Sequence, residues 1–124
     1  MDRKFIITAL IYAILGMLLG IVMAASKNHN QMPAHAHILL VGFVVSFIYA
    51  LCHKLWLNNI SNTLAKLQFY AHQIGAFVML LSLFLLYGNM ANPATLDPIL
   101  AVSSILVWIG IILMALLFMR NKTT

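Results

Sequence analysis

Four long apolar stretches alternate with three short polar segments along the chain. The apolar stretches cover about residues 5–25, 34–57, 64–87 and 98–119. A helix of about 20 apolar residues crosses the hydrocarbon core of a bilayer. Short connections force consecutive helices to be antiparallel neighbours. The pattern therefore predicts an all-α, polytopic membrane protein, with one domain over residues 1–124 built as an antiparallel bundle of four transmembrane helices.

Two prolines mark expected helix starts. Pro33 fits the first turn of the second helix, where its missing N–H has no intrahelical partner to lose. Pro98 fits the first turn of the fourth helix, and Asp97 directly before it has the side chain of an N-cap.

Composition supports a location in the lipid bilayer. Of the 124 residues, 64% are apolar and only 7% are charged, against roughly 25% charged in soluble domains. A chain this short buries only about two-thirds of its surface, too little to hide so many apolar side chains. This excludes a water-soluble enzyme and a disordered region. The single cysteine, Cys52, excludes an intrachain disulfide.

The basic residues form no run along the chain, so they do not indicate nucleic-acid binding. Their distribution instead indicates the orientation of the protein in the membrane. With four spans, one side of the membrane holds six of them and the other holds only Lys27; the six are Arg3, Lys4, Lys54, Lys66, Arg120 and Lys122. Basic residues accumulate on the cytoplasmic side. We expect both termini to be cytoplasmic in a bacterial-type inner membrane. The first stretch also has the outline of a signal peptide, but its apolar run exceeds the usual ~7–15 residues, so we expect a retained helix.

Ionisable side chains inside a membrane are rare and indicate function by default. The chain has five histidines: His29, His35, His37, His53 and His72. His29 reads as a solvated residue of the first connection. His53 lies beside a lysine at a helix end, which favours an interfacial position. His72 lies about two turns into the third helix, where a functional role and a packing hydrogen bond are both open.

The segment His35-Ala36-His37 is the strongest candidate in the sequence for a metal or heme site. Side chains at positions i and i+2 of a helix point about 200° apart. The imidazoles of His35 and His37 therefore cannot hold one ion from a regular helix. They can serve two sites on opposite sides of the helix, as axial ligands of heme iron or as ligands of copper or zinc. Histidines at the headgroup level are the alternative. If the turn at Pro33 is unwound, joint copper or zinc binding is also open, with His29 and Met32 completing an outer cluster.

The segment Met32-Pro33-Ala34-His35-Ala36-His37, followed by an apolar helix, resembles the histidine-bearing helices of heme–copper oxidase subunit I. Membrane proteins of the NnrS type, which respond to NO, carry a similar His-Ala-His. The oxidase subunit has three arcs of four helices, and the resemblance covers one arc. It implies a membrane protein of the cytochrome b type, with heme b held by His35 and His37 and with His72 as a further candidate.

The resemblance implies electron transfer or binding of O₂ or NO at the heme, with a quinol or a cytochrome as redox partner. Equivalents of the copper-site histidines, the crosslinked tyrosine and the proton-channel residues are not found, so enzymatic turnover is left open. Two other classes also stay open: a protein that handles copper or zinc, and an interaction subunit without a cofactor.

Assembly follows from the opposed imidazoles. A six-coordinate heme needs a second histidine, which a neighbouring chain can supply if His35 of one protomer faces His37 of the next in a closed ring. We expect a homo-oligomer, for which the resemblance to the three arcs of the oxidase subunit implies a trimer first and a dimer second. The sequence Gly16-Met17-Leu18-Leu19-Gly20 is a GxxxG pattern, which allows close helix contacts of this kind.

Overall fold

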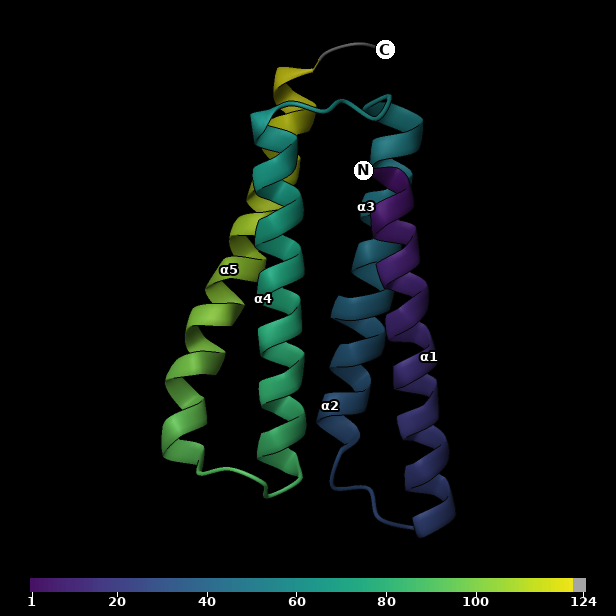
Figure 1. Ribbon diagram of the computed structural model, residues 1–124, viewed down its shortest axis with the longest axis vertical. Helices are drawn as coiled ribbons and strands as arrows, with labels where there is room; N and C mark the ends of the chain where they lie inside the picture. The colour runs from purple at the N-terminus through teal and green to yellow at the C-terminus, as the bar shows by residue number, and fades with distance from the viewer. Residues whose placement is uncertain (122–124) are drawn as a thin grey trace.

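The computed structural model describes residues 1–121 as four long helices joined by three short connections (Figure 1). α1 covers Asp2–Ser26, the second long helix covers Met32–Trp56, α4 covers Thr63–Tyr87, and α5 covers Pro93–Arg120. Each is long and apolar enough to cross a membrane. The predicted all-α architecture of four spans is therefore confirmed.

The second long helix is irregular. It consists in order of α2 (Met32–His37), the π-helical η1 (Ile38–Val45), α3 (Ser46–Leu51) and the π-helical η2 (Cys52–Trp56). Pro33 lies in its first turn, as predicted. The wide turns of π-helices are rare and are frequently found at functional sites. Here the first of them begins directly after His37 and changes the register of every residue that follows.

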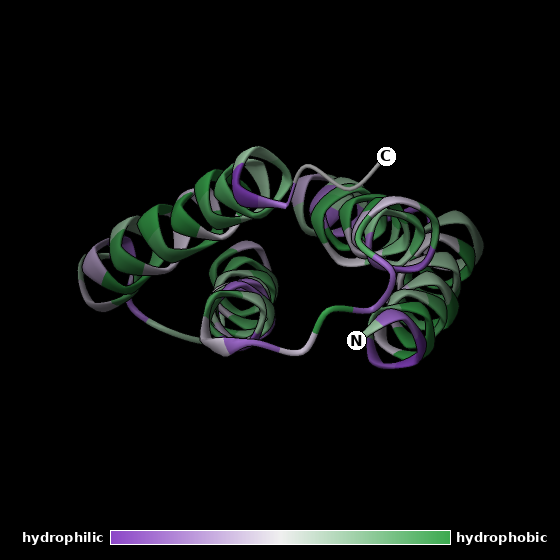
Figure 2. Cartoon of the chain, turned by 90° about the horizontal axis from the view of Figure 1, so that it is seen from above, coloured by the Kyte–Doolittle hydropathy of each residue, from purple (hydrophilic) through white to green (hydrophobic). Residues whose placement is uncertain are grey.

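The four helices form two hairpins. α1 packs along η1 and α3, and α4 packs along α5 (Figures 1 and 2). The hairpins meet where α2 and η1 contact α4, and α3 and η2 also reach α4 through the hydrogen bonds of Ser46 with His72 and of His53 with Gln68. Apolar residues cover the helices over most of their length, as a lipid-facing surface requires (Figure 2).

Glycines bring α1 close to the second long helix. A Cβ atom on Gly16 would lie 2.6 Å from the Leu39 side chain, and one on Gly42 would lie 2.6 Å from the Tyr12 ring. With contacts this short, a methyl group at either glycine would force the neighbouring side chain to shift. The GxxxG pattern of α1 therefore serves packing within the chain.

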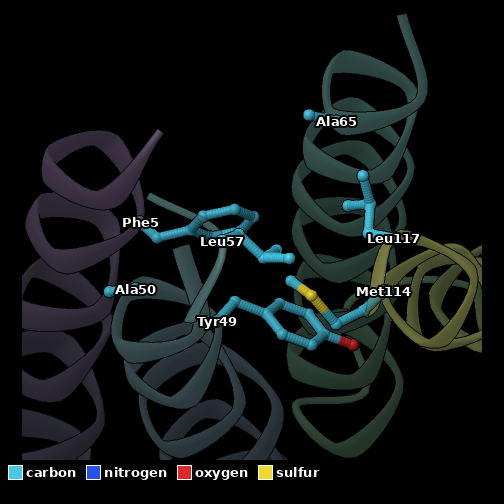
Figure 3. Close-up of a cluster of buried hydrophobic side chains, with 7 residues drawn as sticks. All are labelled: Phe5, Tyr49, Ala50, Leu57, Ala65, Met114 and Leu117. Carbon is cyan, nitrogen blue, oxygen red and sulfur yellow. The ribbon is translucent and has the colours of Figure 1, made fainter. Parts of the chain in front are cut away.

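A cluster of buried side chains joins the two hairpins near the start of α1 (Figure 3). Every long helix contributes to it. Its members are Phe5, Tyr49, Ala50, Leu57, Ala65, Met114 and Leu117. This cluster closes the end of the bundle at which α1 begins and α5 ends.

The fourth span begins earlier than the sequence pattern predicts. Asn92 caps α5, and its side chain accepts a hydrogen bond from the Ala94 backbone N–H at 3.0 Å. Pro98 lies inside the helix, so the predicted cap at Asp97 is wrong. Asn92-Pro93 supplies the same cap-and-proline signal five residues earlier, and the helix starts at the first of the two.

The basic residues are divided between the two ends of the bundle. The start of α1, the connection over residues 57–62 and the end of α5 lie at one end (Figure 1). The helix ends and connection there carry Arg3, Lys4, Lys54, Lys66 and Arg120, and Lys27 follows α1 at the opposite end. Lys122, the sixth residue of the predicted cytoplasmic set, lies outside the described residues.

Candidate functional site

His35 lies on α2 with its ring against α1. Its Nδ1 is 2.8 Å from the backbone oxygen of Gly16. A Cβ atom on Gly20 would lie 2.8 Å from the His35 Cε1, so the absence of a side chain at Gly20 makes room for the imidazole. Because a carbonyl oxygen only accepts, Nδ1 carries the hydrogen, and Nε2 of the neutral ring keeps its lone pair.

His37 is anchored in the same way but faces outward. Its Nδ1 is 2.7 Å from the backbone oxygen of Pro33, one turn earlier on α2, and the residue is exposed. In a neutral ring with this hydrogen bond, the lone pair is on Nε2. Only His35 packs on α1, which confirms that the two imidazoles point in different directions from a regular helix.

His72 lies far from this pair, in the buried interior between the hairpins. Its side chain is fully buried, and its Nε2 is 2.8 Å from the Ser46 hydroxyl. The ring meets Tyr49 edge to face, with 4.9 Å between the ring centroids. Of the two roles left open for His72, the structure contains the packing hydrogen bond.

His53 is not interfacial, and that prediction is wrong. The side chain is fully buried and stacks on Phe5, with 5.4 Å between the ring centroids. Its Nε2 is 3.3 Å from the Gln68 side-chain oxygen of α4. Lys54 next to it is exposed, so the two adjacent residues lie on different faces of the helix end.

The five histidines thus form two groups at opposite ends of the bundle. His53 and His72 both flank Phe5, with the His72 ring centroid 6.0 Å from that of Phe5. His35 instead packs beside Gly16. Phe5 and Gly16 are eleven residues apart on α1, which corresponds to roughly 16 Å along the helix axis. His72 therefore cannot bind the same heme iron as His35 within one chain.

The outer cluster proposed for copper or zinc does not gather in the structure. Among residues 1–121, no three His, Cys, Asp or Glu side chains come together in a way that could hold a metal ion. His29 lies in the first connection and is exposed, as predicted, and Met32 is exposed as well.

Gln31, which lies one turn before His35, makes a contact that the sequence pattern does not predict. Its Nε2 donates to the Phe84 backbone oxygen at 2.9 Å and ties the start of α2 to the end of α4. Its Oε1 is buried and has no hydrogen-bond partner among the described residues. The amide-rich composition of the first connection is the signal that could have drawn attention to it.

No family model, curated protein or solved structure matches the chain.

Proposed function

We propose that the chain is a membrane heme protein of the cytochrome b type and that His35 is an axial ligand of the iron. One observation carries the proposal: the Nδ1 of His35 hydrogen bonds to the Gly16 carbonyl. Histidines that bind metals almost always donate their other ring N–H to a carbonyl, a carboxylate or water. The contact selects the tautomer whose Nε2 binds iron, and it holds the ring against α1. The resemblance of the surrounding segment to heme–copper oxidase subunit I points the same way.

His37 is the second proposed ligand, for a heme on the other side of α2. Its Nδ1 is held by Pro33, and its ring lies on the outer surface of the bundle. An imidazole on the surface of a transmembrane helix is uncovered unless headgroups or a neighbouring chain meet it. We therefore propose a homo-oligomer in which His35 of one protomer and His37 of the next share a heme, as a trimer or a dimer.

A heme b held by both His35 and His37 would supply a one-electron couple for electron transfer, whereas a heme held by only one of them would keep a position for O₂ or NO. The residues of this chain supply a nitrogen ligand, fix its tautomer and orient its ring. Electron transfer or gas binding is accordingly the proposed activity, and oxidase turnover is not part of the proposal. Within residues 1–121, no group of three metal-binding side chains favours copper or zinc handling.

We also propose that the end carrying Arg3, Lys54 and Arg120 faces the cytoplasm of a bacterial-type inner membrane, since basic residues accumulate on that side. In this orientation His35 and His37 lie near the outer surface. That position agrees with the low-spin heme of the oxidase family that the segment resembles.

The absorption spectrum of the protein, expressed with a sufficient heme supply and purified in mild detergent, tests the heme proposal. We expect a Soret band that sharpens on reduction with dithionite. A colourless protein would overturn the proposal, whether or not copper or zinc is bound. Native mass spectrometry of the same sample tests the shared site. We expect an oligomer, and a monomer that keeps one six-coordinate heme would contradict the sharing.

A further inference from the structure

A polar pocket opens where the first and third connections meet, at the end of the bundle opposite the N-terminus. It has a volume of about 240 Å³. Amide side chains from both connections line the pocket, and none of its lining residues is charged; the amides are those of Asn28, Asn30, Gln31 and Asn89. Amide groups both donate and accept hydrogen bonds. The pocket is therefore suited to a polar group that has no net charge.

Two helices end at this pocket. α1 ends at Ser26 and α4 ends at Tyr87, and both residues line the pocket (Figure 1). The last four carbonyl groups of a helix have no partner within the helix, and the C-terminus of a helix carries a partial negative charge. Two such ends at one pocket favour a positive group, and their carbonyl oxygens favour one that carries N–H donors.

An apolar groove continues from the pocket toward the middle of the membrane. It has a volume of about 440 Å³, lies between α1 and α4, and shares Leu19 and Val22 with the pocket. Apart from Tyr12, its lining side chains are aliphatic or phenyl groups. Leu18 and Phe77, one from each helix, are about half exposed. The groove is therefore open to the hydrocarbon core of the bilayer.

The continuity of pocket and groove indicates an amphipathic ligand that enters from the bilayer. The groove suits an apolar chain, and the pocket lies between two connections, which place it at the membrane surface. A headgroup without net charge fits the pocket lining, and a positive group within that headgroup fits the two helix ends. A phospholipid with a primary ammonium headgroup has all of these properties, because its phosphate and ammonium charges cancel.

We propose that the pocket and the groove together bind one molecule of phosphatidylethanolamine. The ammonium lies at the ends of α1 and α4, where amide and backbone oxygens accept hydrogen bonds from it, and one acyl chain lies in the groove. The phosphate lies toward Asn28. The Oδ1 of Asn28 accepts from the Asn30 backbone N–H at 3.0 Å, so its Nδ2 is the atom left to donate to a phosphate oxygen. Lys27 precedes Asn28 in the chain and adds a positive charge on that side.

This site connects the two hairpins, because α1 belongs to one of them and α4 to the other. A ligand that binds the folded chain raises its stability by mass action, so the lipid is expected to raise the melting temperature. Neither His35 nor His37 lines the pocket or the groove. The proposal therefore goes beyond the heme function and does not depend on it.

Native mass spectrometry of the protein in mild detergent, titrated with dioleoyl phospholipids, tests the site. Phosphatidylcholine is the matched control, because it has the same acyl chains and net charge but three methyl groups in place of the N–H donors. We expect phosphatidylethanolamine to bind about tenfold more tightly, and to raise the melting temperature where phosphatidylcholine does not. Equal affinities of the two lipids, or tighter binding of the anionic phosphatidylglycerol, would overturn the proposal. This comparison uses only the unmodified protein.

Two leucines of α1 provide a matched pair for the groove. Leu18 lines the groove and is 54% exposed, whereas Leu10 lies outside it and is 51% exposed. Leu18→Trp fills part of the space of the acyl chain and is expected to weaken binding about tenfold, which corresponds to about two buried methylene groups. Leu10→Trp is expected to bind like the wild type. Equal affinities of the two variants would overturn the proposal.

Asn30, which lines the pocket, provides the test of the headgroup. Asn30→Lys adds a second positive charge beside the ammonium and is expected to weaken phosphatidylethanolamine binding about threefold, whereas Asn30→Asp is expected to strengthen it by about the same factor. Effects in the same direction would contradict an ammonium in the pocket. Cross-links that place a second copy of the chain on Leu15 and Leu81, and that the lipid does not prevent, would also overturn the proposal.

Discussion

The imidazole of His35 and the backbone carbonyl of Gly16 are joined by a hydrogen bond of 2.8 Å between Nδ1 and the oxygen. The bond connects the start of the second long helix to the middle of α1. It also determines which ring nitrogen is free. A single contact between neighbouring helices thus sets both the orientation and the tautomer of the proposed heme ligand.

A substitution at Gly20 tests whether the orientation of the His35 ring affects heme binding. A methyl group there would lie 2.8 Å from the His35 Cε1 and would displace the ring. We expect Gly20→Ala to weaken heme binding about tenfold or more, as loss of an orienting contact does at other metal sites. Heme content per chain and the reduced spectrum measure the effect.

Gly42→Ala is the matched control, because its methyl group would press on Tyr12 in the same helix interface. It is expected to lower stability while folded protein keeps the wild-type spectrum. If both alanine variants lose heme equally, the effect reflects general packing between the two helices and the special role of Gly20 is wrong.

The variant Ser46→Ala tests how much a buried polar pair between the hairpins contributes to stability. Ser46→Ala removes the partner of the His72 Nε2 and leaves a fully buried nitrogen unpaired. We expect the free energy of unfolding to fall by about 1–3 kcal/mol, measured by reversible denaturation in detergent micelles. The heme spectrum is expected to stay unchanged, since His72 lies at the opposite end from His35.

Ser103→Ala is the corresponding control. Ser103 is also buried, but its hydroxyl donates to the Leu100 carbonyl of its own helix. Removing this hydroxyl therefore leaves no other side chain without a hydrogen-bond partner. A smaller change, under about 1 kcal/mol, is expected. If both variants lowered the free energy of unfolding equally, the hydrogen bond between Ser46 and His72 would contribute no more to stability than any buried serine hydroxyl does.

Orientation is tested with fusions to the C-terminus. The distribution of basic residues predicts that this end is cytoplasmic. An alkaline phosphatase fusion is expected to be inactive and a green fluorescent protein fusion to be bright. Active phosphatase would invert the topology and place His35 on the cytoplasmic side, against the comparison with the oxidase family.

The four spans could be predicted from the sequence because the thickness of the membrane sets the length of a spanning helix, and that length is visible as a run of apolar residues. The opposed directions of His35 and His37 followed from helix geometry alone. The start of α5 was missed because Asn92-Pro93 and Asp97-Pro98 carry the same local signal. Local sequence cannot rank two such signals when the surrounding residues allow either start.

The positions of His53 and Gln31 could not be predicted, because they depend on how helices rotate against one another. The lysine beside His53 favours an interfacial position, yet η2 turns the ring toward Gln68 and the ring of Phe5. Gln31 depends on a contact with Phe84, 53 residues further along the chain. Such contacts are set by the meeting of the two hairpins, which no periodicity within one helix reports.

The most direct test of the heme assignment compares reduced-minus-oxidised spectra of the wild type, His35→Ala and His29→Ala, each purified with the same heme supply. His29 is an exposed histidine of the first connection and serves as the control. The account predicts that His29→Ala keeps the wild-type heme bands and that His35→Ala loses them or converts them to a five-coordinate form. Unchanged heme bands in folded His35→Ala protein would contradict the account.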